Sequence, residues 1–232
     1  MDWLLLTSLG SAALVWPLAL ALGLVLAAER VSLARLARWW AALALASLAV
    51  AATKVLFYGW GTGVRDWNLT CFSGHATLAT AFWPVALAAA GGQARWARWL
   101  GGVSGLVLAG AVAVSRVELQ AHPVSEALAG VLLGLPVAVL GLRTLQERQP
   151  LRRHPVLLAG VVGAAFLAGL GRWVPYVPSE QWFQRAGVAL SGRDKPVNRH
   201  RWLARTAVVP MSGQDPAARV PRIQWSARLA QP

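Results

Sequence analysis

Two ionisable residues four positions apart, His122 and Glu126, flank a proline in a polar stretch between two long apolar runs. Ionisable groups close to membrane-spanning segments are costly and mark candidate functional sites. Pro123 suits the first turn of a helix, so we expect His122 at the helix N-terminus and Glu126 on the same face. The carboxylate can then accept a proton from one imidazole nitrogen, which leaves the other nitrogen free to attack or to bind.

A basic residue, Arg116, precedes this pair by six positions. Its planar fork of donors fits a phosphate, and the N-terminus of a helix also favours one. Together these residues predict phosphoryl chemistry. A purely structural His–Glu pair remains an alternative, and so does a metal pair. No third histidine or acidic cluster accompanies the pair to complete a metal site, because His154 and His200 lie in other contexts.

A second candidate helix start is the segment Ser73-Gly74-His75, immediately before another apolar run. Ser73 is a natural N-cap, and Gly74 and His75 would begin the helix. Two helix N-termini, each with a histidine, would therefore lie in one layer. Taken alone, the segment is better explained by a capping serine and a solvated histidine at the membrane interface.

Lysine is scarce in this arginine-rich chain, because only Lys54 and Lys195 are present. Lys54 lies near the end of the second apolar run, where a compact ammonium could serve a ligand or simply extend to the membrane interface. The segment from Gly59 to Trp67 that follows contains three glycines and Arg65.

These segments resemble the type-2 phosphatidic acid phosphatase superfamily, which includes lipid phosphate phosphatases and undecaprenyl pyrophosphate phosphatases. Its motifs are Lys-x6-Arg-Pro, Pro-Ser-Gly-His and Ser-Arg-x5-His-x3-Asp. Phe72 replaces the proline of the second motif, and Glu126 replaces the aspartate of the third, which begins at Ser115. Lys54 matches the start of the first motif, but its arginine is missing at the expected distance, and Arg65 is the nearest candidate. The resemblance covers about residues 54–130.

The resemblance implies a catalytic role for three residues. His122 would attack phosphorus and form a phosphohistidine, while Glu126 holds its tautomer. His75 would protonate the leaving oxygen and then activate water. The phosphate oxygens would be held by groups from all three motifs, namely Lys54, Arg65, Ser73, Gly74, Ser115 and Arg116. The scheme requires no metal or other cofactor.

The composition predicts an all-α, polytopic membrane protein. Of the 232 residues, 56% are hydrophobic and only 13% are charged. Six apolar runs are transmembrane candidates, at residues 3–28, 39–60, 74–91, 97–114, 123–142 and 155–172. The first run is too long for a signal peptide and lacks a basic start, so we interpret it as a span. The single cysteine, Cys71, excludes a disulfide within the chain. We therefore expect a six-helix bundle over residues 1–172 and a C-terminal extramembrane tail over residues 173–232.

The charge of +13 is better explained by anionic lipid than by nucleic acid, because the arginines lie in short loops and in the tail. Alternate loops, near residues 29–38, 95–98 and 143–153, are basic and should be cytoplasmic. The motif loops near 61–73 and 115–122 should then face the periplasm of a bacterial inner membrane. By parity the tail emerges on the motif side, although it carries nine Lys and Arg against three Asp and Glu.

The tail combines arginines with aromatic residues and seven prolines, which suits the membrane interface. Residues 179–190 are expected to form an amphipathic helix on the bilayer, capped by Ser179, beside the active-site mouth. A disordered basic extension is the alternative. The aromatic residues of the tail are Trp173, Tyr176, Trp182, Phe183, Trp202 and Trp225.

The sequence thus predicts an integral membrane phosphatase acting on a lipid phosphate or pyrophosphate. Membrane lipids and that substrate are the expected partners, and nucleic acid is not. A phosphotransferase using the same site is the alternative within catalysis. A non-catalytic lipid-binding or transport protein on the same fold is the alternative outside it.

Overall fold

A computed structural model describes residues 2–92, 94–146 and 178–204. These residues form helices, a 3-10 turn and loops, and within them no strand is present. A single antiparallel bridge joins Val64 to Leu69. The elements in chain order are α1 (Trp3–Ser8), α2 (Ala12–Ala28), α3 (Leu33–Trp60), η1 (Arg65–Trp67), α4 (Gly74–Ala90), α5 (Arg95–Glu118), α6 (Val124–Gln146), α8 (Ser179–Ser191) and α9 (Arg199–Ala204). The expectation of an all-α chain is confirmed for this part.

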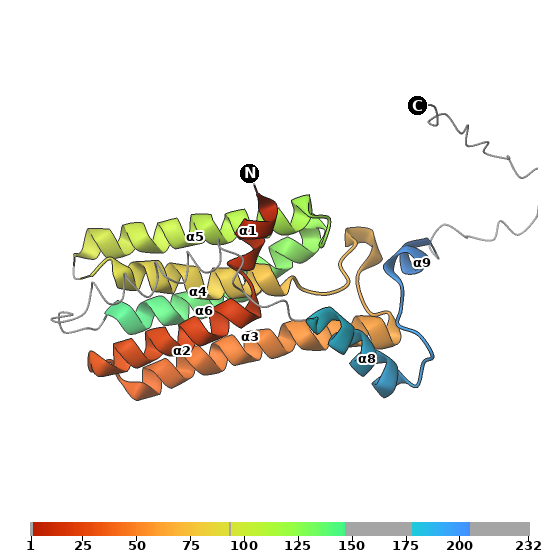
Figure 1. The fold of residues 1–232 in the computed structure, drawn as a ribbon, viewed down its shortest axis with the longest axis horizontal. Coiled ribbons are helices and arrows are strands. Elements are labelled where there is room, and N and C mark those ends of the chain that lie inside the picture. The colour runs from red at the N-terminus through yellow and green to blue at the C-terminus, as the bar shows by residue number, and fades with distance from the viewer. Residues whose placement is uncertain (1, 93, 147–177, 205–232) are drawn as a thin grey trace, which may run out of the picture.

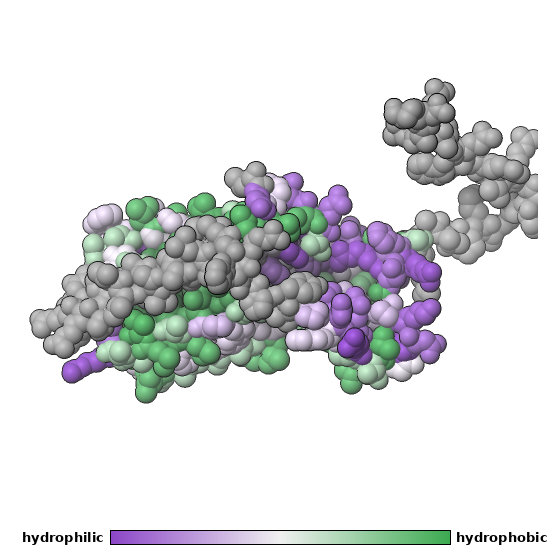
Figure 2. Space-filling model, viewed as in Figure 1, coloured by the Kyte–Doolittle hydropathy of each residue, from purple (hydrophilic) through white to green (hydrophobic). Residues whose placement is uncertain are grey.

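The long helices α2 to α6 lie side by side, and α8 and α9 gather at one end of the bundle (Figure 1). Three helices, α3, α5 and α6, are long and apolar enough to cross a membrane, and α2 is a shorter apolar helix. Large apolar side chains are exposed on their outer faces, among them Leu24, Leu45, Leu48, Val107 and Leu132. In Figure 2 apolar residues cover the flank of the bundle, and polar residues concentrate at the end that carries α8 and α9. The chain is therefore a membrane protein.

The centre of the bundle is α4, which is buried along almost its whole length. Its alanines and threonines are small, so neighbouring helices can approach its backbone closely. A Cβ added to Gly105 of α5 would lie 2.5 Å from the backbone of Pro84. A Cβ added to Gly134 of α6 would lie 2.6 Å from the carbonyl oxygen of Thr77. Glycines on both partner helices thus set the spacing of the bundle around α4.

The expected single span over residues 3–28 is wrong, because the run is divided into α1 and α2. Asp2 caps α1 by accepting from the Leu4 N–H at 3.0 Å. The chain then turns at Gly10, where an added Cβ would lie 2.6 Å from the carbonyl oxygen of His75. The break therefore packs on the start of α4. The expected sixth span, residues 155–172, lies outside the described residues, so the number of spans stays a prediction.

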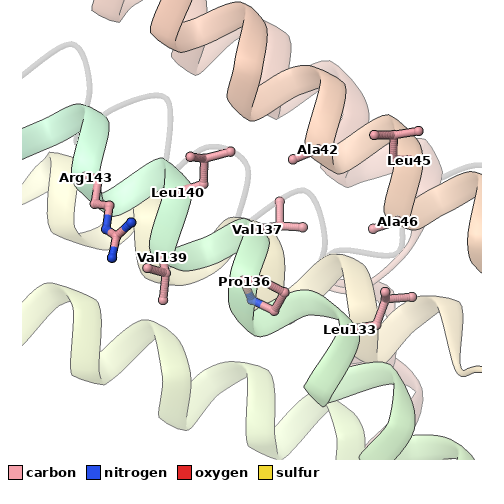
Figure 3. Close-up of a pocket in the computed structure, with 9 residues that line it drawn as sticks. All are labelled: Ala42, Leu45, Ala46, Leu133, Pro136, Val137, Val139, Leu140 and Arg143. Carbon is pink, nitrogen blue, oxygen red and sulfur yellow. The ribbon is translucent and has the colours of Figure 1, made fainter.

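A groove of about 530 Å³ lies between α3 and α6. Figure 3 shows its lining, which is aliphatic apart from Arg143 near the C-terminal end of α6. No histidine or carboxylate of the motifs lines it. The groove is therefore separate from the reactive side chains.

Candidate active site

The second and third motifs meet through a direct backbone hydrogen bond. The Ser73 N–H donates to the carbonyl oxygen of Glu126 at 3.1 Å. Below this bond, Gly130 of α6 faces the carbonyl of Ser73, where a Cβ would approach to 2.6 Å. The absence of a side chain at Gly130 lets the N-terminus of α6 lie against that of α4. The two helix starts expected from the sequence are therefore adjacent.

The turn between α5 and α6 carries His122 back beside Arg116. The carbonyl of Arg116 accepts from the Ala121 N–H at 3.0 Å and from the His122 N–H at 3.2 Å. Gln120 adopts a left-handed conformation with φ 52°, and its N–H donates to Val117 at 2.8 Å. This is the Schellman pattern that ends many helices, here with glutamine in place of the usual glycine. It explains in backbone terms how five residues between Arg116 and His122 place them together.

His122 and Glu126 form the expected pair. Nδ1 of His122 lies 2.6 Å from Oε2 of Glu126, and both side chains are buried. With the carboxylate ionised, Nδ1 carries the proton and Nε2 keeps its lone pair. Burial lowers the pKa of His122, and the charges of Lys54 and Arg116 lower it further against the opposing effect of Glu126. The imidazole is therefore neutral near pH 7. Pro123 lies one position before α6, where its carbonyl accepts the first helical bonds.

The other carboxylate oxygen of Glu126 is held by several donors. Oε1 accepts from the Thr70 N–H at 2.9 Å, from the Cys71 N–H at 3.2 Å and from the Thr70 hydroxyl. A guanidinium nitrogen of Arg199 in α9 also donates to it. The carboxylate is thus fixed through one oxygen while the other engages His122. This arrangement accommodates the glutamate that stands where the motif has aspartate.

Ser73 is placed as expected, but its hydroxyl does not cap the helix. Its backbone takes the extended conformation of an N-cap, and its carbonyl accepts from Thr77 at 3.0 Å. The hydroxyl makes no hydrogen bond, although it is fully buried. A buried polar atom without a partner costs free energy, so such an atom is well suited to a ligand.

Arg116 also has a free donor. Nη1 donates to the Thr7 hydroxyl of α1 at 2.9 Å, and Nε is buried without a partner. In contrast, the neighbouring Ser115 hydroxyl donates to the Val112 carbonyl of its own helix at 2.6 Å. Gly74 and His75 form the first turn of α4, and His75 lies within electrostatic reach of Lys54, Arg116 and His122.

Lys54 is buried in α3 and reaches the same end of the bundle, where Glu180 of α8 pairs with it. The Tyr58 hydroxyl donates to the other oxygen of Glu180, and the ring of Phe183 lies 5.5 Å from the ammonium. Burial by itself would raise the pKa of the Glu180 carboxyl. The charge of Lys54 and the hydrogen bonds from Lys54 and Tyr58 outweigh this effect and hold that pKa below its usual range. Glu180 is therefore ionised at neutral pH. A snorkelling lysine would be free in solvent instead.

Arg65 lies apart from this cluster. It is exposed in η1, with its guanidinium 5.2 Å from the ring of Trp202. The arginine that the structure brings to Glu126 is Arg199. No spacing rule could have indicated Arg199, Glu180 or Thr7, because each reaches the site through a contact with a distant segment.

The tail forms the expected helix, with two differences. α8 spans Ser179–Ser191, but Pro178 occupies the N-cap position and no side chain caps the helix. Gly187 packs on Gly59 of α3, where an added Cβ would lie 2.8 Å from the backbone nitrogen. The helix therefore lies on the protein. A disordered extension is wrong for residues 178–204, and residues 205–232 lie outside the described part.

Within the described residues, Cys71, His122 and Glu126 place their potential metal ligand atoms within 4.8 Å of one another. The carboxylate oxygens already accept from His122, Thr70, the Cys71 N–H and the guanidinium of Arg199. A cation would have to displace these donors and would repel that guanidinium. The donor set fits an orienting carboxylate better than a metal centre.

The comparisons with known proteins agree with the motifs. The family model described as "PAP2 superfamily" matches residues 59–150. A Klebsiella pneumoniae protein named "Uncharacterized 22.5 kDa protein in cps region" is 39% identical over 155 residues, which cover 65% of this chain and 72% of that protein. No solved structure matches the chain.

Proposed function

Because the chain belongs to the PAP2 superfamily, we propose that it is an integral membrane phosphatase that hydrolyses a lipid phosphate or pyrophosphate through a phosphohistidine at His122. The observation that carries the proposal is the bond between Nδ1 of His122 and Glu126 at 2.6 Å. It leaves Nε2 as the nucleophile beside two buried donors without partners, Ser73 Oγ and Arg116 Nε.

In the first step, Nε2 of His122 attacks phosphorus, and the bond from phosphorus to the leaving oxygen breaks. Glu126 stabilises the imidazolium that forms, because its carboxylate accepts the Nδ1–H. The negative charge of the bound phosphate would favour the protonated form of His75, at the start of α4, which gives its proton to the leaving oxygen and becomes neutral. The products are the dephosphorylated lipid and a phosphohistidine.

In the second step, water attacks the phosphohistidine. Neutral His75 accepts a proton from the water, the P–N bond breaks, and inorganic phosphate leaves. The Ser73 hydroxyl and Arg116 would hold the equatorial oxygens, where negative charge accumulates. The N-terminus of α4 adds its unpaired N–H groups to this cradle.

Lys54 would complete the cradle once a phosphate competes with Glu180 for it. An ammonium that already holds a carboxylate is arranged to hold an anion of similar charge. The Glu180 side chain is 45% exposed, so it can move into solvent when substrate enters.

The position of the site supports a lipid substrate. His122 and His75 lie at the ends of membrane-length or buried apolar helices, so a head group anchored in the bilayer can reach them. The α2–α3 and α4–α5 connections lie at the other end of the bundle (Figure 1), and the basic residues there are Arg30 in the turn before α3, Arg35 in the first turn of α3, and Arg95 and Arg98 in the first turn of α5. By the positive-inside rule, the site then faces the periplasm of a bacterial inner membrane.

The test is phosphate release by the purified full-length protein in detergent. The panel contains phosphatidic acid, a polyprenyl pyrophosphate and a short soluble phosphate ester, with His122→Ala as the control. We expect release from at least one lipid by wild type and none by the variant. Transfer to an added alcohol would identify a phosphotransferase. A folded protein that releases no phosphate from any of them would contradict the proposal and favour a non-catalytic lipid-binding protein.

A further inference from the structure

A guanidinium from the C-terminal segment is part of the active-site cluster. Arg199 of α9 donates through Nη2 to Oε1 of Glu126 and to the hydroxyl of Thr70. The Glu126 side chain has no exposed area, and that of Arg199 is 27% exposed. Residue 199 lies outside residues 59–150, which the family model matches. A residue from outside the matched segment therefore contacts the motif residues.

Two anchors on either side of Arg199 fix its position. The Val197 N–H donates to the Tyr58 carbonyl at the end of α3 at 2.9 Å. Trp202 Nε1 donates to the Gly61 carbonyl at 2.7 Å, and its buried ring packs edge-on against Phe57 at 5.7 Å. Because the backbone is held before and after it, Arg199 is directed at Glu126.

The charge of Arg199 matters because the carboxylate it meets is buried. A buried carboxylate needs a counter-charge and filled hydrogen bonds to stay ionised at low cost. Thr70 and the Cys71 N–H supply neutral donors to Oε1, and Arg199 supplies the cation. Oε2 is then left for Nδ1 of His122.

We propose that Arg199 is a positioning residue, supplied by the C-terminal segment, that holds Glu126 so that His122 keeps the tautomer and orientation needed for attack on phosphorus. The proposal rests on the proposed function. This role is distinct from that expected of Arg65, the nearest candidate for the missing arginine of the first motif, whose guanidinium lies over Trp202.

Removing the Arg199 charge should change the protonation of His122 in a defined direction. Three charged groups act on His122 directly, namely Lys54 of α3, Arg116 of α5 and Glu126 of α6, and Arg199 of α9 acts through Glu126. The other titratable groups nearby are Cys71, His75 of α4 and Glu180 of α8. Without Arg199, the carboxylate would act on the imidazole with its charge uncompensated. The pKa of His122 should then rise.

The experiment compares Arg199→Gln and Arg199→Lys with the matched control Arg201→Ala, an exposed arginine of the same helix. Steady-state hydrolysis of p-nitrophenyl phosphate is measured against pH in full-length protein. We expect Arg199→Gln to lower kcat about 10²-fold with little change in KM, because a displaced reacting group costs about that much. In the plot of rate against pH, the midpoint of the acid limb, where Arg199→Gln loses activity on acidification, should move to higher pH. Arg199→Lys should keep more of kcat and the wild-type limb, and Arg201→Ala should match wild type.

The proposal is overturned if folded Arg199→Gln keeps the wild-type kcat and acid limb, or if Arg199→Lys loses as much as Arg199→Gln. If Arg199→Gln yields no folded protein, Arg199→Met, which also removes the charge but keeps a long side chain, is judged against wild type by the same criteria. An independent readout is the pH dependence of carbethoxylation of the His122 peptide by diethyl pyrocarbonate. Its midpoint should be higher in the variant, and an unchanged midpoint contradicts the proposal even if wild type hydrolyses nothing. Inactivity of wild type towards the lipid panel contradicts the proposed function alone.

Discussion

The backbone N–H of Ser73 donates to the carbonyl oxygen of Glu126 at 3.1 Å, so the starts of α4 and α6 are joined by their main chains. This bond places the unpartnered Ser73 hydroxyl next to the helix turn that carries the His122–Glu126 pair. The approach of Ser73 to Glu126 depends on main-chain atoms and not on flexible side chains. The packing of α4 on α6 therefore sets the spacing between the Ser73 hydroxyl and the His122–Glu126 pair.

The packing at Gly130 should therefore be essential. In Gly130→Ala the new Cβ would lie 2.6 Å from the Ser73 carbonyl, so α4 and α6 must separate. We expect kcat to fall by about 10²-fold or more, together with a lower Tm. Gly110→Ala in α5 is the matched control, because nothing lies within 4 Å of its added Cβ. In a helix interior that change should be neutral or stabilising by about 0.5–1 kcal/mol. Equal effects of the two changes would contradict this interpretation.

The length of the Glu126 side chain should also matter. Its two oxygens bridge Thr70 and Cys71 on one side and His122 on the other. Glu126→Asp is one methylene shorter and should lose one of these contacts, with kcat reduced by about 10²-fold. Glu126→Gln keeps the length but loses the charge, and should lose substantial activity while remaining folded. Steady-state kinetics with circular dichroism as the folding control provide the measurement. Full activity of the Gln variant would exclude Glu126 as the orienting group.

The pH profile should reflect the burial of His122. Its pKa is lowered from the ordinary value of 6.5, and the neutral form attacks. Activity should therefore be lost as the pH falls through a midpoint below 6.5, and should be retained between that midpoint and neutrality. The measurement is kcat/KM against pH for the short ester. An acid limb with its midpoint above 6.5 would show that another group, or a charged His122, controls the step.

Removing the carboxylate from Lys54 should strengthen anion binding. In Glu180→Gln the ammonium loses its counter-charge, so vanadate no longer competes with a carboxylate for it. We expect the inhibition constant of vanadate to fall several-fold. Glu118→Gln, an exposed position at the end of α5, is the control for net charge. A weaker inhibition by vanadate in Glu180→Gln would mean that Glu180 positions Lys54 instead of competing for it.

The orientation can be tested by labelling. After replacement of Cys71, single cysteines at the exposed positions Thr62 and Gln120 should react with an impermeant maleimide in intact cells. A cysteine at Arg30, an exposed residue of the turn between α2 and α3 at the other end, should react only after lysis. The reverse pattern would place the site in the cytoplasm.

The sequence by itself determined the local geometry of the site. A four-residue spacing on a helix puts His122 and Glu126 on one face, and that pair is present. The starts of α4 and α6 also followed from Ser73 and Pro123, since the first turn of a helix has distinctive chemistry. These features depend on neighbours along the chain, so a pattern of residues can indicate them.

Only the tertiary structure decided which groups surround that pair. Arg199 is 73 positions from Glu126, and Glu180 is 126 positions from Lys54. Their meeting depends on Gly187 packing against Gly59 and on Trp202 binding the Gly61 carbonyl. The break between α1 and α2 lies in the polar segment Thr7–Ser11, which local sequence could have indicated, but its packing at Gly10 on the His75 carbonyl is a tertiary contact. Each of these contacts is selected by the free energy of packing between distant helices, which local periodicity does not encode.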